Sequence, residues 1–185
     1  MLTYQQTKQI LDAAELIHSA QVVSQTVQRL AVDITEVLSH QQPLVLCVMG
    51  GAVVFTGQLL PLLRFPLDFD YLHLTRYNKA LSGGEIHWQV EPKENMKDRV
   101  VLVLDDILDE GITLAAIRKK VLECGAKAFY SAVLANKETG QSKPFSADFV
   151  GLSVPNRYVF GFGMDIQGTW RNLPAIYAIK NETGE

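Results

Sequence analysis

Three carboxylates stand close together in the sequence, directly after an apolar run. Residues 100–104 are all valine or leucine, which is typical of a buried strand, and Asp105, Asp106 and Asp109 follow them. Adjacent strand residues point their side chains to opposite sides. An acidic pair of this kind could accept hydrogen bonds from a sugar diol or hold a divalent cation through water. A hydrated strand end, or a metal-binding site unrelated to sugars, explains the acidic pair alone equally well.

The residues that follow the acidic pair favour a phosphate site. Residues 109–113 offer successive backbone N–H groups, the hydroxyl of Thr113, and a glycine, Gly111, that permits close approach to phosphate oxygens. An apolar helical pattern begins at Leu114, so the segment leads into a helix N-terminus, where free N–H groups bind anions. A carboxylate pair beside such a phosphate cradle is what a ribose 5-phosphate requires.

The elements needed to position these residues are those of an α/β protein. Strands are expected over residues 44–49, 67–77, 100–104 and 128–135, with helices over 53–63 and 114–123 between them. Two helices are expected over 4–18 and 20–38, and short extended segments over 149–152, 158–162 and 175–179. This alternation predicts a central, mostly parallel sheet flanked by helices, with ligands at the carboxyl ends of its strands. The N-terminal and C-terminal segments are expected to form a small hood.

A polar stretch with two adjacent glycines follows the second of these strands. Within it, residues 86–90 are expected to pair back as a hairpin arm. We interpret residues 78–90 as a mobile excursion from the sheet. A tight turn made by its glycines and a functional covering loop are equally good explanations of the local pattern.

Length and composition limit the class of protein. The chain has 185 residues, which fits a single domain over 1–185, and its 48% hydrophobic and 20% charged residues are typical of a folded globular protein. A net charge of −3 without a Lys/Arg cluster argues against nucleic-acid binding. The two scattered cysteines, Cys47 and Cys124, form neither a disulfide framework nor a metal-ligand set. Because no segment has the pattern of a signal peptide or a membrane span, we expect a cytoplasmic protein without a membrane partner.

The segment with the three carboxylates resembles the phosphoribosyl pyrophosphate signature of the type I phosphoribosyltransferases. The similarity extends over about residues 44–179 and is, in detail, to the hypoxanthine-guanine phosphoribosyltransferases of bacterial type. It implies that Asp105 and Asp106 hold the ribose hydroxyls and that Asp109 faces the purine N7 as general acid/base. The residues that it assigns to the 5-phosphate, besides Asp109, are Glu110, Gly111, Ile112 and Thr113.

Three further stretches are similar to the family's pyrophosphate loop, its flexible catalytic loop and a pyrophosphate-binding arginine. Gly50 and Gly51 lie in a segment that resembles the loop whose backbone amides meet the leaving group. Arg76 and Tyr77 resemble the start of the flexible catalytic loop that covers the reacting centre. Arg171 resembles an arginine that contacts pyrophosphate.

The purine base is assigned to residues near the ends of two later strands. Lys137 matches a lysine that reads the 6-oxo group, and Tyr158 matches an aromatic residue that stacks on the base. The backbone of Val159 would meet the exocyclic edge. Taken singly, Tyr158 could belong to the core and Lys137 to the surface. Their occurrence in the order of the family favours the binding roles.

The cofactor implied by the resemblance is Mg²⁺. Asp165 resembles an aspartate that supports magnesium, with a turn cap as its alternative role, and Asp105 and Asp106 are the other candidate ligands. The implied activity is purine salvage: the 5-phosphoribosyl group moves from phosphoribosyl pyrophosphate to N9 of hypoxanthine or guanine, giving IMP or GMP and pyrophosphate. A homodimer or homotetramer is implied as well. The alternatives are a nucleotide-sensing regulator on the same fold and a xanthine-preferring transferase.

The chain departs from the family pattern at three positions. Gly50 stands where many relatives carry lysine, which removes any contribution of that lysine to the pyrophosphate loop. Glu110 and Ile112 stand where relatives often have threonine and lysine or leucine. Because a carboxylate beside a phosphate is unfavourable, we expect the Glu110 side chain to turn outward while its backbone N–H binds.

Overall fold

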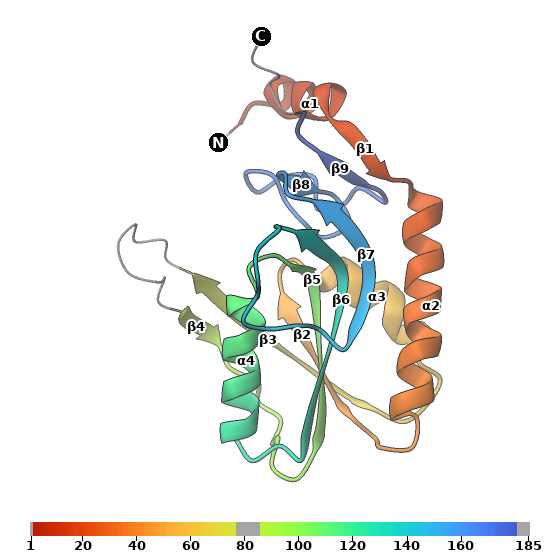
Figure 1. Cartoon of the computed structure of the whole chain (residues 1–185), viewed down its shortest axis with the longest axis vertical. Coiled ribbons are helices and arrows are strands. Elements are labelled where there is room, and N and C mark those ends of the chain that lie inside the picture. The colour runs from red at the N-terminus through yellow and green to blue at the C-terminus, as the bar shows by residue number, and fades with distance from the viewer. Residues whose placement is uncertain (1, 77–85, 181–185) are drawn as a thin grey trace.

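The central layer of the molecule is a six-stranded sheet. The computed structural model describes residues 2–76 and 86–180 (Figure 1). The strand order is β4-β3-β2-β5-β6-β7. The strands are β2 (Leu44–Met49), β3 (Asp68–Arg76), β4 (Ile86–Val90), β5 (Val100–Leu108), β6 (Ala128–Glu138) and β7 (Phe149–Pro155). All neighbours are parallel except β4, which pairs antiparallel with β3. The predicted mostly parallel sheet and its hairpin arm are confirmed.

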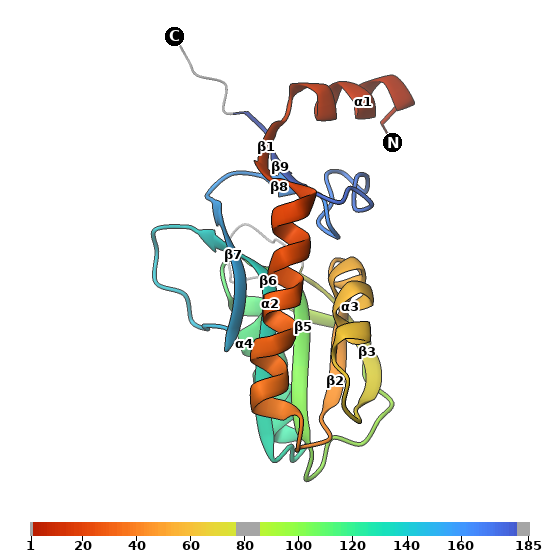
Figure 2. The same cartoon turned by 90° about the vertical axis from the view of Figure 1, so that its right-hand side faces the viewer.

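Helices cover both faces of this sheet (Figure 2). They are α2 (Ala20–Leu38), α3 (Val53–Leu59) and α4 (Ile112–Glu123). Leu102 and Leu104 of the central strand β5 belong to the core formed with α2 and α3, while Val101 and Val103 belong to the core formed with α4. All four side chains are fully buried. Because β5 is packed on both faces, the acidic residues at its carboxyl end stand on a rigid support.

A smaller sheet, the hood, stands over the carboxyl ends of the main strands (Figure 1). Its antiparallel strands are β1 (Glu15–His18), β8 (Val159–Phe160) and β9 (Ile176–Ala178), in the order β1-β9-β8. Helix α1 (Tyr4–Ala13) lies at its outer end. The N-terminal and C-terminal parts of the chain therefore meet in one sheet.

The prediction of one helix over residues 4–18 is wrong at its end. Helix α1 stops at Ala13, Ala14 is extended, and Glu15–His18 form β1 instead. Strand β9 offers backbone partners to this segment, with Leu16 opposite Tyr177. Pairing with a strand far along the chain thus overrides a helical spacing that is short and weakly apolar.

Several other bounds differ from the expectation. Strand β5 continues to Leu108, so the acidic pair lies inside the strand and not after it, and β6 extends to Glu138. Helix α3 ends at Leu59 and is followed by a 3₁₀ turn over Leu60–Leu62. Only Val159–Phe160 of the predicted segment 158–162 are a strand, because Gly161 turns the chain with a φ of 99°. Within the described residues, no helix has both the length and the apolar character needed to cross a membrane.

Candidate active site

Two cavities meet where the hood faces the carboxyl ends of the strands. The first has a volume of about 380 Å³ and is lined by the segment after β2, the end of β3, the segment from β5 into α4, and Arg171. The second has a volume of about 210 Å³ and is lined by the end of β5, Lys137 of β6, and hood residues that include Tyr158 and Asp165. Asp106 and Asp109 line both cavities. The two spaces are therefore joined by carboxylates.

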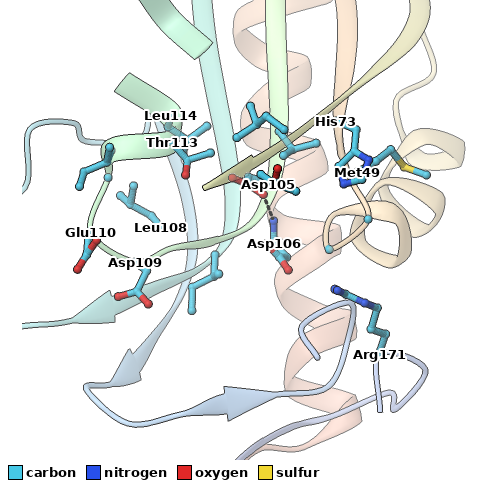
Figure 3. A pocket seen from close by; sticks show the side chains of 18 residues that line it. Met49, His73, Asp105, Asp106, Leu108, Asp109, Glu110, Thr113, Leu114 and Arg171 are labelled. Carbon is cyan, nitrogen blue, oxygen red and sulfur yellow. Dashed lines mark hydrogen bonds between the residues drawn. The ribbon is translucent and has the colours of Figure 1, made fainter. Parts of the chain in front are cut away.

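The acidic pair lies at the centre of the site (Figure 3). Only 6% of Asp105 is exposed, and its Oδ1 accepts a hydrogen bond from the backbone N–H of Asp106 at 3.0 Å. Burial and the neighbouring charge of Asp106 raise the pKa of Asp105 well above its ordinary value. Burial also raises the pKa of Asp106, although hydrogen bonding to Asp105 and the charge of Arg171 oppose the change. Hydroxyl donors or a cation in the cavity would stabilise the charged forms.

Two glycines allow the acidic pair, the segment after β2 and the hood to touch. A Cβ atom added to Gly51 would lie 1.9 Å from Oδ2 of Asp106. A Cβ atom on Gly163, which has a φ of 103°, would lie 2.0 Å from the carbonyl oxygen of Gly51. The peptide bond between Met49 and Gly50 is cis. A side chain at position 51 or 163 would therefore push these segments apart.

The segment predicted to bind phosphate, residues 109–113, leads into the N-terminus of α4. Gly111 precedes the helix with a φ of 81°, in the left-handed region that favours glycine, and no side chain caps the helix there. The first N–H groups of a helix have no partners within it, so they remain available to an anion. Residues 109–113 all line the first cavity, and Figure 3 places Asp109, Glu110 and Thr113 across from Arg171. Glu110 itself is exposed.

The second cavity contains a close ion pair. Nζ of Lys137 lies 2.5 Å from Oδ2 of Asp109, and the two side chains are 14% and 47% exposed. Lys137 is therefore not a free surface lysine. Tyr158 is 54% exposed and so is not a core residue, whereas Val159 is buried. Burial and the charge of Asp165 raise the pKa of the Tyr158 hydroxyl. These five residues surround a space with an aromatic wall and a charged donor.

The hood holds Arg171 over the first cavity. Its Nη1 donates to the carbonyl oxygen of Gly163 at 2.6 Å, and its Nη2 lies 2.6 Å from Oδ1 of Asp165. The other oxygen of Asp165 accepts from the backbone N–H of Gly168 at 2.7 Å, so this residue also caps a turn. Asp165 thus serves as an anchor for the arginine.

The three candidate magnesium ligands do not form one cage. Asp105 lines the first cavity and Asp165 the second, with Asp106 between them. In the part of the chain that the structure describes, no three His, Cys, Asp or Glu side chains are grouped to hold a metal. The carboxylate oxygens of these residues still fit Mg²⁺, because this ion is commonly held by one or two carboxylates together with substrate phosphates and water.

Some site residues were missed by the sequence argument, and two predicted ones are not described in full. His73 and Thr75 line the first cavity from the end of β3. Their place at the carboxyl end of a parallel strand, beside the strand that leads to Gly51, is the signal that could have found them. Arg76 ends β3, while Tyr77 lies outside the described residues. Their predicted role in a covering loop stays a prediction.

An open, mostly parallel sheet is combined here with a glycine-led helix entry, a largely buried acidic pair and a hood, and this arrangement is chemically suited to a phosphorylated sugar. Comparison with known proteins agrees: a model of the phosphoribosyl transferase domain matches residues 13–167. The chain therefore belongs to the phosphoribosyl transferase family, and its named relatives are transferase enzymes.

Named relatives align over nearly the whole chain. The hypoxanthine-guanine-xanthine phosphoribosyltransferase of Tritrichomonas foetus is 30% identical over 95% of this chain and 96% of its own length. The hypoxanthine-guanine phosphoribosyltransferase of Bacillus subtilis is 29% identical over 91% of this chain and 94% of its own. A solved hypoxanthine-guanine-xanthine phosphoribosyltransferase has a TM-score of 0.79 at 28% identity, covering 92% of this chain and 97% of that one. A Staphylococcus aureus hypoxanthine phosphoribosyltransferase shares the fold, with a TM-score of 0.87 at 20% identity over 95% of this chain and 96% of that one.

Proposed function

We propose that this chain transfers the 5-phosphoribosyl group of phosphoribosyl pyrophosphate to N9 of hypoxanthine or guanine, giving IMP or GMP and pyrophosphate. The observation that carries the proposal is the junction of two cavities at Asp106 and Asp109. The first suits a phosphorylated sugar with its leaving group, and the second suits a planar base. The names of the relatives support the same reaction.

The first cavity would bind phosphoribosyl pyrophosphate. The N–H groups of residues 109–113 would hold the 5-phosphate, and Asp105 and Asp106 would accept hydrogen bonds from the ribose hydroxyls. Backbone groups at Gly50 and Gly51 and the guanidinium of Arg171 would meet the pyrophosphate. A guanidinium is well suited to this place, because its charge and its several donors match phosphate oxygens.

The second cavity would bind the purine. Tyr158 would stack on the base, the backbone of Val159 would meet its C2 edge, and Lys137 would donate to the 6-oxo oxygen. An ammonium group has only donors, so it can pair with a 6-oxo oxygen and cannot accept from a 6-amino group. The lysine therefore favours hypoxanthine and guanine over adenine.

In the reaction, N9 of the purine attacks C1 of the ribose while the bond from C1 to the pyrophosphate oxygen breaks. Pyrophosphate leaves with the electron pair, and positive charge develops on the ribose in the transition state. Asp109 accepts the proton that the base loses at N7. Arg171 stabilises the negative charge that accumulates on the leaving group.

Mg²⁺ is proposed as the cofactor and would neutralise charge on the pyrophosphate when bound. Asp105, Asp106 and Asp165 are the residues that would hold it, together with the phosphates of the substrate and water. A cytoplasmic location and a homodimeric or homotetrameric assembly are further parts of the proposal. The free thiols of Cys47 and Cys124 are compatible with a reducing compartment.

The proposal is tested by incubating the protein with phosphoribosyl pyrophosphate, Mg²⁺ and hypoxanthine, guanine or xanthine, and measuring nucleotide and pyrophosphate. Formation of IMP and GMP, each with one equivalent of pyrophosphate, is expected. A much faster reaction with xanthine would instead favour the xanthine-preferring alternative. No transfer to any base, together with a shift of RNA or DNA in a gel assay, would favour a nucleotide-sensing regulator.

A further inference from the structure

The loop between β6 and β7 sends one lysine side chain back to the site. Nζ of Lys143 donates to the carbonyl oxygen of Leu108 at 2.9 Å, to Oδ1 of Asn136 at 2.8 Å and to the carbonyl oxygen of Lys137 at 2.7 Å. An ammonium group has three N–H donors, so all of them are used. One acceptor belongs to β5 and two belong to β6, so the ammonium joins the carboxyl ends of these strands.

This cross-link lies where the pairing of the two strands ends. The last paired residues of β5 and β6 are Leu108 and Asn136. Asp109 follows directly on one strand and Lys137 on the other, and their side chains meet at 2.5 Å. Backbone pairing therefore does not fix Asp109, and the bonds of Lys143 hold the residues on both sides of the ion pair.

The rest of the loop is also packed against the site. Phe145 is buried and makes an edge-to-face contact with Phe129, with ring centroids 6.0 Å apart. A Cβ atom on Gly111 would lie 3.3 Å from the carbonyl oxygen of Phe145 and 3.4 Å from Cβ of Lys143. The loop thus supports the entry to α4 as well. Burial lowers the pKa of Lys143, and the nearby charge of Asp109 opposes that change.

We propose that Lys143 is a positioning residue that holds Lys137 against Asp109 at the purine edge of the site, and this inference rests on the function proposed above. Lys143 acts through Lys137, whose own ammonium would read the base. The two backbone carbonyls that Lys143 binds are those of Lys137 and Leu108. They fix the backbone from which the side chains of Lys137 and Asp109 extend. Displacement of such groups by about 1 Å can slow a reaction by roughly 10²-fold.

The test compares Lys143→Met, which keeps the length of the side chain and removes its donors, with the wild-type enzyme. We expect kcat/KM for hypoxanthine to fall roughly 10- to 100-fold, with KM for phosphoribosyl pyrophosphate close to that of the wild type. Lys119→Met is the matched control, because Lys119 is 78% exposed on α4 and is expected to leave both constants unchanged. Asn136→Ala removes one acceptor and should produce a smaller loss, which keeps the test open if Lys143→Met does not fold.

A double-mutant cycle separates positioning from general stabilisation. In a Lys137→Met background, the further change Lys143→Met should lower kcat/KM for hypoxanthine by much less than it does alone. The ammonium group of Lys137, which Lys143 is proposed to position, is already missing there. An equal loss in both backgrounds would overturn the inference. The inference would also be overturned if Lys143→Met lowered Tm but left the steady-state constants unchanged. If Lys143→Met does not fold, the same result for Asn136→Ala would overturn it.

Failure of the underlying function gives a different result. If the wild-type protein does not transfer the 5-phosphoribosyl group to any oxopurine, the proposed function and this inference are overturned together. An active wild-type protein with an additive cycle would overturn only the role of Lys143.

Discussion

At the scale of single residues, the three neighbouring carboxylates of the site have different surroundings. Asp105 is buried and lines only the first cavity, whereas Asp109 is half exposed and is paired with Lys137 beside the second cavity. Asp106 lines both spaces. Their different surroundings suit the first for binding hydroxyl groups and the last for moving a proton.

The exchange Asp109→Asn tests the proton transfer. An amide has nearly the shape of the carboxyl group but cannot accept the N7 proton, so turnover should fall by about 10²-fold or more. IMP should still bind, because the phosphate and ribose contacts are unaffected. Steady-state and single-turnover rates are measured beside IMP binding by calorimetry. Unchanged rates would remove Asp109 from this role.

The exchange Asp105→Asn tests the cost of the buried charge. Because the pKa of Asp105 is raised well above its ordinary value in the folded protein, its ionisation destabilises the ligand-free fold as pH rises. Asparagine keeps the acceptor for the Asp106 N–H and removes the charge. The variant should therefore melt at a higher temperature than the wild type, by an amount that grows as pH rises above the ordinary carboxyl pKa and levels off above the raised pKa, and should bind phosphoribosyl pyrophosphate weakly.

Asp70 provides a control of opposite sign. Burial alone would raise its pKa, but hydrogen bonds from the backbone N–H groups of Glu94, Tyr71 and Lys93 lower it. Its charge thus stabilises the fold above pH 3.8, and this contribution is lost as pH falls through the lowered pKa. Asp70→Asn should lower Tm at neutral pH. An Asp105→Asn variant with the same loss of Tm would contradict the assignment of a destabilising charge.

At the scale of elements, the site depends on how closely three segments approach. The segment after β2, the end of β5 and the hood meet at Gly51, where Asp106 and Gly163 leave no room for a side chain. Each segment carries a different part of the proposed substrate site. Their contact therefore couples the loop proposed to bind pyrophosphate to the carboxylates proposed to bind ribose.

The exchange Gly51→Ala tests this contact. Its methyl group must displace the Asp106 carboxylate, so KM for phosphoribosyl pyrophosphate should rise roughly tenfold or more, and overpacking should cost about 1–3 kcal/mol of stability. Gly57→Ala is the control, because nothing lies within 4 Å of a Cβ there and the residue is inside α3. The control should keep its activity and become slightly more stable. Equal behaviour of the two variants would contradict the close-contact account.

The sequence predicted these elements unevenly, for physical reasons. The runs that became β2 and β5 were found because they are apolar on both faces. Strand β1 was missed because its partner, β9, lies near the other end of the chain. Lys143 was missed for a similar reason: one of its acceptors is 35 residues away, and an isolated lysine in a polar loop carries no pattern. The contacts of Gly51 likewise appear only once the hood is folded over the strands.

At the scale of the whole molecule, the site lies between two sheets. The main sheet contributes the acidic pair and Lys137, and residues 109–113 connect its strand β5 to α4, while the hood side contributes Tyr158, Asp165 and Arg171. The hood itself joins the two ends of the chain through β1 and β9. The complete site therefore requires the N-terminal and C-terminal parts to fold together.

Removal of magnesium tests how the metal enters the site. Since the described residues provide no three-ligand cluster, the ion is expected to arrive with phosphoribosyl pyrophosphate. Addition of EDTA should abolish transfer and leave the Tm of the ligand-free protein unchanged. A marked drop in Tm would instead indicate a resident structural metal.

Competition between hypoxanthine and adenine tests the central proposal most directly. Both bases are supplied together at equal concentration with limiting phosphoribosyl pyrophosphate and Mg²⁺, and the nucleotide products are separated and quantified. Because Lys137 can donate but not accept, IMP should be the dominant product, by roughly 10²-fold or more. Formation of AMP in equal or greater amount, or of no nucleotide at all, would contradict the assignment of this chain as a 6-oxopurine phosphoribosyltransferase.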